Sequence, residues 1–255
     1  MRSSITSSPA AVASKINNGG VEFLKRASYG EAISSFTTAL SKVKQMLIAD
    51  DEEDDIATTT SNEQQQQPQQ QQSQCVGDST DMSGDTFPPS MSSLESREML
   101  MMVDPNQRSI FCKPIILRAA KDERPTLKLY NRYSFAIMFN LALAHHLSGM
   151  ETTEVSRIGK LRKALRLYEY AYSIQMQEDV QLQITYTLGM VNNLGHIQEH
   201  LGEVQKAQQC FQHLLSTLMY VIESGEEGSD EGQWDVFFHN ITHLVLRESA
   251  LAAAA

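Results

Sequence analysis

The chain has 255 residues, of which 41% are hydrophobic and 20% are charged, and its formal net charge is −10. This length suits one domain of ordinary size or two small ones, with enough apolar residues for a real core. No run approaches the ~18 consecutive apolar residues of a membrane-spanning helix, so we expect no membrane partner. The three cysteines are widely separated, which is typical of neither a disulfide framework nor a zinc site.

The negative charge is concentrated in one segment. Residues 50–95 contain eleven Asp or Glu and no Lys or Arg, and without them the net charge would be +1. The rest of the chain therefore gives no electrostatic argument for binding nucleic acid. Residues 50–93 are also rich in Gln, Ser and Gly, so they bury too little apolar surface to offset chain entropy. We predict a disordered acidic, Gln-rich loop there, which is either a tolerated insertion, an activation-like tract or a phosphorylated regulatory segment.

The other predicted elements, in chain order, are mostly helical. A flexible N-terminus over residues 1–8 ends in Ser8 as N-cap, with Pro9 in the first helical position. The segment 94–126 is predicted to combine a short Met-rich helix with an extended apolar stretch at Ile110–Leu117, because Pro114 argues against a helix there. The remaining predicted elements are helical hairpins over 9–49, 127–178 and 180–225 and a capping helix over 230–255.

Small and aromatic residues recur at a fixed spacing in the predicted hairpins. In the first and third hairpins a glycine is followed twelve residues later by an alanine, and four residues further by a phenylalanine. Small residues let two antiparallel helices approach closely, and the aromatic ring fills the space one turn further along. In the second hairpin the interval between the two small residues is 22, which predicts a turn insertion near residues 151–159. The residues concerned are Gly20, Ala32, Phe36, Ala142, Ala164, Tyr168, Gly195, Ala207 and Phe211.

These positions resemble the signature of the tetratricopeptide repeat (TPR) family, W-x2-L-G-x2-Y followed by A-x3-F. The match covers residues 16–49, 138–178 and 191–222, although the closing proline is absent and the repeat spacing is irregular. The phrase around Asn192 is most similar to kinesin light chains, and residues 139–147 resemble uncharacterised algal TPR-like proteins. The resemblance implies an all-α fold of seven or eight helices, with hairpins stacked as a short solenoid and a capping helix at its end.

Asparagine recurs at one position of the repeats, as Asn18, Asn140 and Asn193, and Asn240 holds the same position in the last helix. The neighbouring positions are core-facing, so we expect this one to point to the opposite face. In TPR proteins of the kinesin-light-chain and O-GlcNAc-transferase kinds, the matching asparagines line the concave groove. An amide both donates and accepts, so it can pair with the backbone of an extended peptide of any sequence. The alternative is that local bonds or water satisfy these amides.

The predicted function is a non-enzymatic scaffold or adaptor that binds a peptide segment of a partner protein in this groove. The alternative is a self-regulated adaptor whose groove is covered by residues 110–117. We expect no catalytic residues, no cofactor and a cytoplasmic location, or alternatively a nuclear one. The sequence does not indicate the oligomeric state.

Two further groups are candidate binding residues. His196 and His200 lie in the repeat helix and could contact the partner, but with Glu199 they also match H-x-x-E-H, the inverted zinc-peptidase motif. A zinc hydrolase needs a third protein ligand, which the remaining sequence hardly supplies, so this is the least favoured alternative. A basic run could dock an acidic or phosphorylated peptide, or could be an ordinary solvated face. Its candidate residues are Arg157, Lys160, Lys163 and Arg166.

Overall fold

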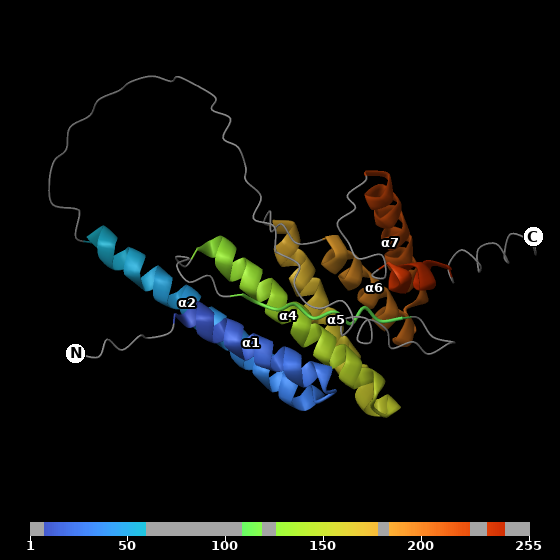
Figure 1. Ribbon diagram of the computed structural model, residues 1–255, viewed down its shortest axis with the longest axis horizontal. Coiled ribbons are helices and arrows are strands. Elements are labelled where there is room, and N and C mark those ends of the chain that lie inside the picture. The colour runs from blue at the N-terminus through green and yellow to red at the C-terminus, as the bar shows by residue number, and fades with distance from the viewer. Residues whose placement is uncertain (1–7, 60–108, 119–125, 178–183, 225–233, 243–255) are drawn as a thin grey trace, which may run out of the picture.

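The computed structural model describes residues 8–59, 109–118, 126–177, 184–224 and 234–242. Over these residues the chain is helical apart from turns and one extended segment, and it contains no β-strand, which confirms the all-α class (Figure 1). The predicted Met-rich helix and residues 60–93 lie outside the described residues, as does most of the predicted capping helix. The helices are α1 (Pro9–Lys25), α2 (Tyr29–Thr59), α4 (Leu127–Met150), α5 (Glu154–Gln177), α6 (Ile184–His200) and α7 (Val204–Ser224), and residues 235–242 are also helical.

Consecutive helices pack in pairs, as the sequence predicts. The pairs are α1 with α2, α4 with α5, and α6 with α7. The packing of α2 on α4 and of α5 on α6 then joins one hairpin to the next (Figure 1). One hydrophobic cluster runs through all three hairpins, because a single hairpin cannot cover its own apolar face.

Local sequence explains where several helices begin and end. Ser8 is the N-cap of α1: its Oγ accepts a hydrogen bond of 3.2 Å from the backbone N–H of Ala11, and Pro9 follows at the first helical position. After α6, Gly202 has a φ of 78°, a left-handed conformation that glycine adopts at low cost. Only three residues connect the helices within each hairpin.

The predicted small residues lie at the seam between paired helices. A Cβ atom added to Gly20 would lie 2.6 Å from the ring of Phe36, and one added to Gly195 would lie 2.8 Å from the ring of Phe211. Both rings are fully buried. Each glycine therefore packs directly against an aromatic ring of the paired helix. The sequence predicted instead that the glycine faces the small residue of that helix.

Two predicted boundaries are wrong. The second hairpin has no turn insertion, since α4 runs to Met150 and α5 begins at Glu154. The extra residues lengthen α4 and α5 instead, because residues 142–164 contain no proline that would end a helix. Helix α2 continues to Thr59, so residues 50–59 are helical although we predicted that the disordered loop begins at 50. Neither Gly nor Pro interrupts those ten residues, and acidic side chains by themselves do not end a helix.

Among the described helices, none has both the length and the apolar character needed to cross a bilayer.

Candidate functional site

Residues 109–118, called the strap below, form an extended segment that crosses the molecule beside the first helices of the hairpins (Figure 1). This confirms the extended conformation predicted for Ile110–Leu117. The strap contributes to the hydrophobic core through side chains that are at most 6% exposed. Lys113 and Pro114 are half-buried, and Arg118 is exposed. The buried apolar side chains of the strap are Ile110, Phe111, Cys112, Ile115 and Leu117.

Asn240 and Asn193 bind the first half of the strap through both atoms of their amides. The Oδ1 of Asn240 accepts a hydrogen bond from the N–H of Ser109, and its Nδ2 donates to the carbonyl of the same residue, both at 2.7 Å. Asn193 pairs in the same way with the N–H and the carbonyl of Phe111, at 2.8 and 3.0 Å. Each amide thus satisfies the donor and the acceptor of one strap residue.

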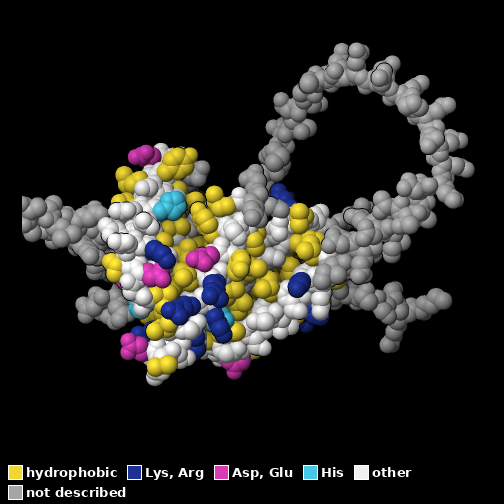
Figure 2. All heavy atoms as spheres, turned by 180° about the vertical axis from the view of Figure 1, so that it is seen from behind, with side chains coloured by type: hydrophobic (Ala, Val, Ile, Leu, Met, Phe, Trp, Pro, Cys, Tyr) yellow, Lys and Arg dark blue, Asp and Glu magenta, His cyan; other side chains and the backbone are white. Residues whose placement is uncertain are grey.

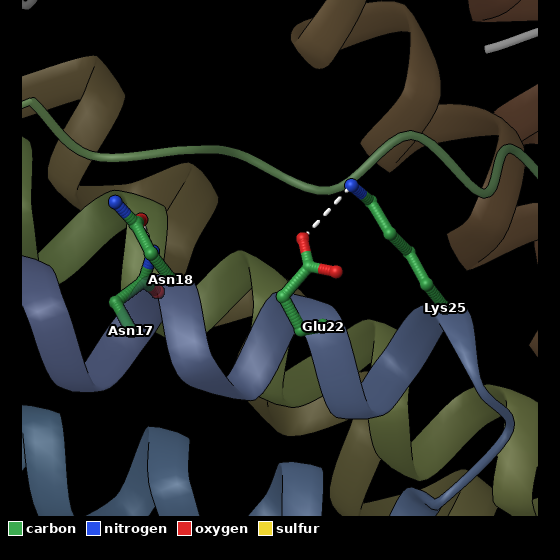
Figure 3. A network of polar contacts seen from close by, with 4 residues as sticks. All are labelled: Asn17, Asn18, Glu22 and Lys25. Carbon is green, nitrogen blue, oxygen red and sulfur yellow. Dashed lines mark hydrogen bonds and ion pairs between the residues drawn. The ribbon is translucent and has the colours of Figure 1, made fainter. Parts of the chain in front are cut away.

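Asn140 and Asn18 bind the second half of the strap in the same way. Asn140 pairs with the N–H and the carbonyl of Ile115, both at 2.7 Å, and Asn18 pairs with those of Leu117 at 3.0 and 2.8 Å. Figure 3 shows Asn18 pointing from α1 toward the strap. The four predicted asparagines therefore form one continuous set, called the asparagine row below, that consists of Asn18, Asn140, Asn193 and Asn240.

The geometry of an extended chain explains this pairing. The N–H and C=O of one residue point to the same side of such a chain, and every second residue points that way again. The paired residues are all odd-numbered, so they point to the same side of the strap: 109, 111, 115 and 117. Residue 113 has the same orientation but makes none of these paired bonds to the asparagine row. The strap runs against the order of the hairpins, because its first paired residue, Ser109, meets the helical segment 235–242 and its last paired residue, Leu117, meets α1.

Two further amides, which the repeat pattern did not predict, also bind the strap. Asn17 donates to the carbonyl of Ile115 at 3.1 Å, and Asn192 donates to the carbonyl of Ser109 at 3.0 Å. Each of them directly precedes a residue of the asparagine row, so the doubled asparagines were the signal that could have found them. Asn17 also accepts a hydrogen bond of 3.0 Å from Asn140, which links α1 to α4.

Tyr168 holds Asn193 in its binding orientation. The Nδ2 of Asn193 donates to the hydroxyl oxygen of Tyr168 at 3.0 Å, in addition to its bond to the strap. Burial raises the pKa of Tyr168 well above its usual range, and the bond from Asn193 acts in the opposite direction. The hydroxyl therefore stays neutral and keeps its place in the network at physiological pH.

Phe111 fills a pocket that exists because residue 189 has no side chain. A Cβ atom added to Gly189 of α6 would lie only 2.3 Å from the Phe111 ring. Three aromatic rings surround Phe111, from Phe139 at 6.4 Å, Tyr186 at 6.1 Å and Phe237 at 5.6 Å between ring centroids. The sequence predicts no role for this glycine, since nothing in it indicates which ring approaches residue 189.

The two histidines of the H-x-x-E-H motif have different surroundings. His196 is buried, and its Nδ1 lies 3.0 Å from the Nε2 of His146 on α4. The ring of His200 stacks on His196 at 4.4 Å between centroids. Burial lowers the pKa of His146 to about 3, and His200 adds to the effect. The described residues contain no group of three His, Cys, Asp or Glu side chains that could hold a metal ion.

The predicted basic run divides into two parts. Arg157 donates to the carbonyl of Thr152 in the turn between α4 and α5 at 3.3 Å, and Lys160 donates to the hydroxyl of Ser148 in the last turn of α4 at 2.8 Å. The other two candidates, Lys163 and Arg166, are exposed. Figure 2 shows Lys and Arg side chains gathered among apolar ones on the face behind that of Figure 1.

No family model, curated protein or solved structure matches this chain. The assignment to the TPR family therefore stays a prediction, which rests on the spacing of its small, aromatic and asparagine residues.

Proposed function

We propose that this chain is a non-enzymatic interaction module of the TPR type, which binds an extended segment of a partner protein on the asparagine row. In this proposal the hairpins stack as a short solenoid, the row lines its concave groove, and the strap covers the groove until a partner segment replaces it. The packing of α2 on α4 and of α5 on α6 supports the stacked arrangement.

The observation that carries the proposal is the paired bonding at four strap residues. Every bond that the asparagine row makes to the strap goes to backbone, so the row requires an extended chain and no particular side chain at those residues. A segment of another protein can satisfy the same donors and acceptors. Each bond contributes only about 0.5–1.5 kcal/mol net, so recognition depends on several of them acting together.

The connections of the strap set the condition that a partner segment has to meet. Residues 60–108 join it to α2, and residues 119–125 join it to the start of α4. A segment tethered in this way is present at high effective concentration, so the closed state is the ground state. A partner segment then has to bind more tightly than the strap, or the strap has to be weakened first.

The buried apolar side chains of the strap favour a second candidate, in which it is a permanent part of the core. Phe111 and Leu117 are as well covered as many helical core residues. The two candidates differ in one measurable property, namely whether an added peptide can take the place of the strap in the intact chain.

The buried thiol of Cys112 allows that measurement. In the full chain carrying Cys75→Ser and Cys210→Ser, Cys112 is the remaining cysteine, and a maleimide reagent labels it only when the strap opens. A synthetic peptide of residues 107–119 carrying Cys112→Ser should accelerate this labelling in a saturable way, and a scrambled peptide should not. If the peptide neither accelerates labelling nor binds the folded chain, the strap is permanent and the proposed function is wrong.

A further inference from the structure

We infer that the asparagine row selects partner segments with a phenylalanine-sized aromatic side chain at the place of Phe111, followed by branched aliphatic residues four and six positions later. This inference rests on the proposed function, since it assumes that a partner replaces the strap. The bonds of the asparagine row to backbone give no preference for a sequence, and the pocket around Phe111 would supply one.

The first support is the shape of the pocket. Glycine destabilises the interior of a helix, yet α6 has Gly189 directly beneath the Phe111 ring, where any side chain would collide with it. Phe111 is fully buried, and its neighbours are rings from α4, α6 and the segment 235–242. A smaller side chain would leave a cavity, and a larger one would overfill the pocket.

The second support is the spacing of the paired residues. The bonds of Asn193 and Asn140 hold residues 111 and 115 of the strap, so a segment in the same register has three residues between these two points. Ile115 and the paired residue after it, Leu117, are both buried. Lys113, in the middle of the interval, is half-buried, so its position is more tolerant. The resulting pattern is an aromatic residue, three residues, an aliphatic residue, one residue and a second aliphatic residue.

The test uses the full chain with Phe111→Ala in its own strap, which vacates the pocket and leaves the asparagine row unchanged. Fluorescein-labelled peptides of residues 107–119 are compared by fluorescence anisotropy. Relative to the native peptide, one with Phe111→Ala should bind about a hundredfold more weakly or worse. The matched control is a peptide with Ile116→Ala, which should stay within about fivefold because that side chain is only half-buried.

A second variant tests the pocket from the side of the protein. Adding Gly189→Ala to the same chain should weaken the native peptide about tenfold, because the new methyl group occupies the space of the ring. The same substitution in the chain should weaken the binding of a peptide with Phe111→Leu much less. The affinity of the native peptide relative to that of the Phe111→Leu peptide should therefore fall. A general loss of stability would weaken both peptides equally and would contradict the inference.

The outcomes separate this inference from the proposed function. Equal binding of all the peptides overturns the aromatic preference while leaving peptide binding in place. If circular dichroism shows a folded chain and no peptide binds, the proposed function is wrong, and the preference with it. Should the Phe111→Ala chain fail to fold, the same peptides are ranked on the native strap by their acceleration of Cys112 labelling, where the same order is expected.

Discussion

Replacing Asn140 with alanine should open the strap without removing any apolar side chain. In the native chain the amide of Asn140 binds both the N–H and the carbonyl of Ile115. The carbonyl keeps a second donor in Asn17, whereas Asn140 is the partner shown for the N–H. The substitution therefore leaves a buried N–H without that partner and removes one of two bonds at the carbonyl.

The size of the effect on opening follows from these two losses, because the third bond of Asn140, to Asn17, does not involve the strap. A buried donor without a partner costs about 1–3 kcal/mol, and a lost hydrogen bond to a group that keeps another costs about 1 kcal/mol. In the open state water satisfies the same groups, so the whole cost of about 2–4 kcal/mol falls on the closed state. Because 1.4 kcal/mol corresponds to tenfold, the equilibrium constant for opening should rise between about thirtyfold and several hundredfold.

The assay is maleimide labelling of Cys112, three residues from Ile115, in the background without the other two cysteines. Asn140→Ala should raise the labelling rate by the factor given above. Asn131→Ala is the matched control, since Asn131 lies on the same helix, α4, and is partly exposed. Equal rates for the two variants would refute the reasoning, because they would mean that the asparagine row does not hold the strap.

Three other predictions follow from single contacts. The Oγ of Ser109 is buried without a hydrogen-bond partner among the described residues, so Ser109→Ala should slow Cys112 labelling about fivefold and Ser109→Asp should accelerate it; the reverse order would contradict this. Gly20→Ala should lower the free energy of unfolding by about 1–2 kcal/mol, because the new methyl group would collide with the Phe36 ring. The neighbouring Gly19 faces open space, so Gly19→Ala should raise the free energy of unfolding by about 0.5–1 kcal/mol. Denaturant titrations measure both changes. The pKa of His146 is lowered from 6.5 to about 3 by burial, so the unfolded chain binds a proton that the folded chain does not. His146 alone should therefore lower the free energy of unfolding by about 1.6 kcal/mol between pH 6.5 and pH 5, and a flat profile over that range would contradict the buried neutral state.

The asparagine row shows how far sequence reasoning extends into this site. Helical periodicity places Asn140 and Asn193 away from the core-facing positions, and amide chemistry indicates that such residues pair with extended backbone. Both properties are local, so the sequence predicts them. The occupant is not local: 82 positions separate Asn193 from its partner Phe111, and 131 separate Asn240 from Ser109. For that reason the sequence could not decide whether residues 110–117 or a partner segment occupies the groove.

The wrong turn prediction and the features that the sequence did not predict have related causes. The interval of 22 between Ala142 and Ala164 shows that residues have been added, but spacing cannot distinguish a longer turn from longer helices. The hypothesis that His196 contacts a partner rests on its own helix alone and stays a prediction. The surroundings of His196 depend on α4, which brings His146 to within 3.0 Å. The pocket under Phe111 could not be predicted either, because a glycine carries no signal of the ring that approaches it.

The amino-acid sequence by itself determined the helices, their pairing and the position of the amides, because propensity, capping and periodicity act between residues a few positions apart. Only the tertiary structure decided what those amides bind and which side chains are enclosed, because these properties depend on which distant segments the packed core brings together. A strap whose backbone pairs with four separate helical segments has no partner until those segments are assembled.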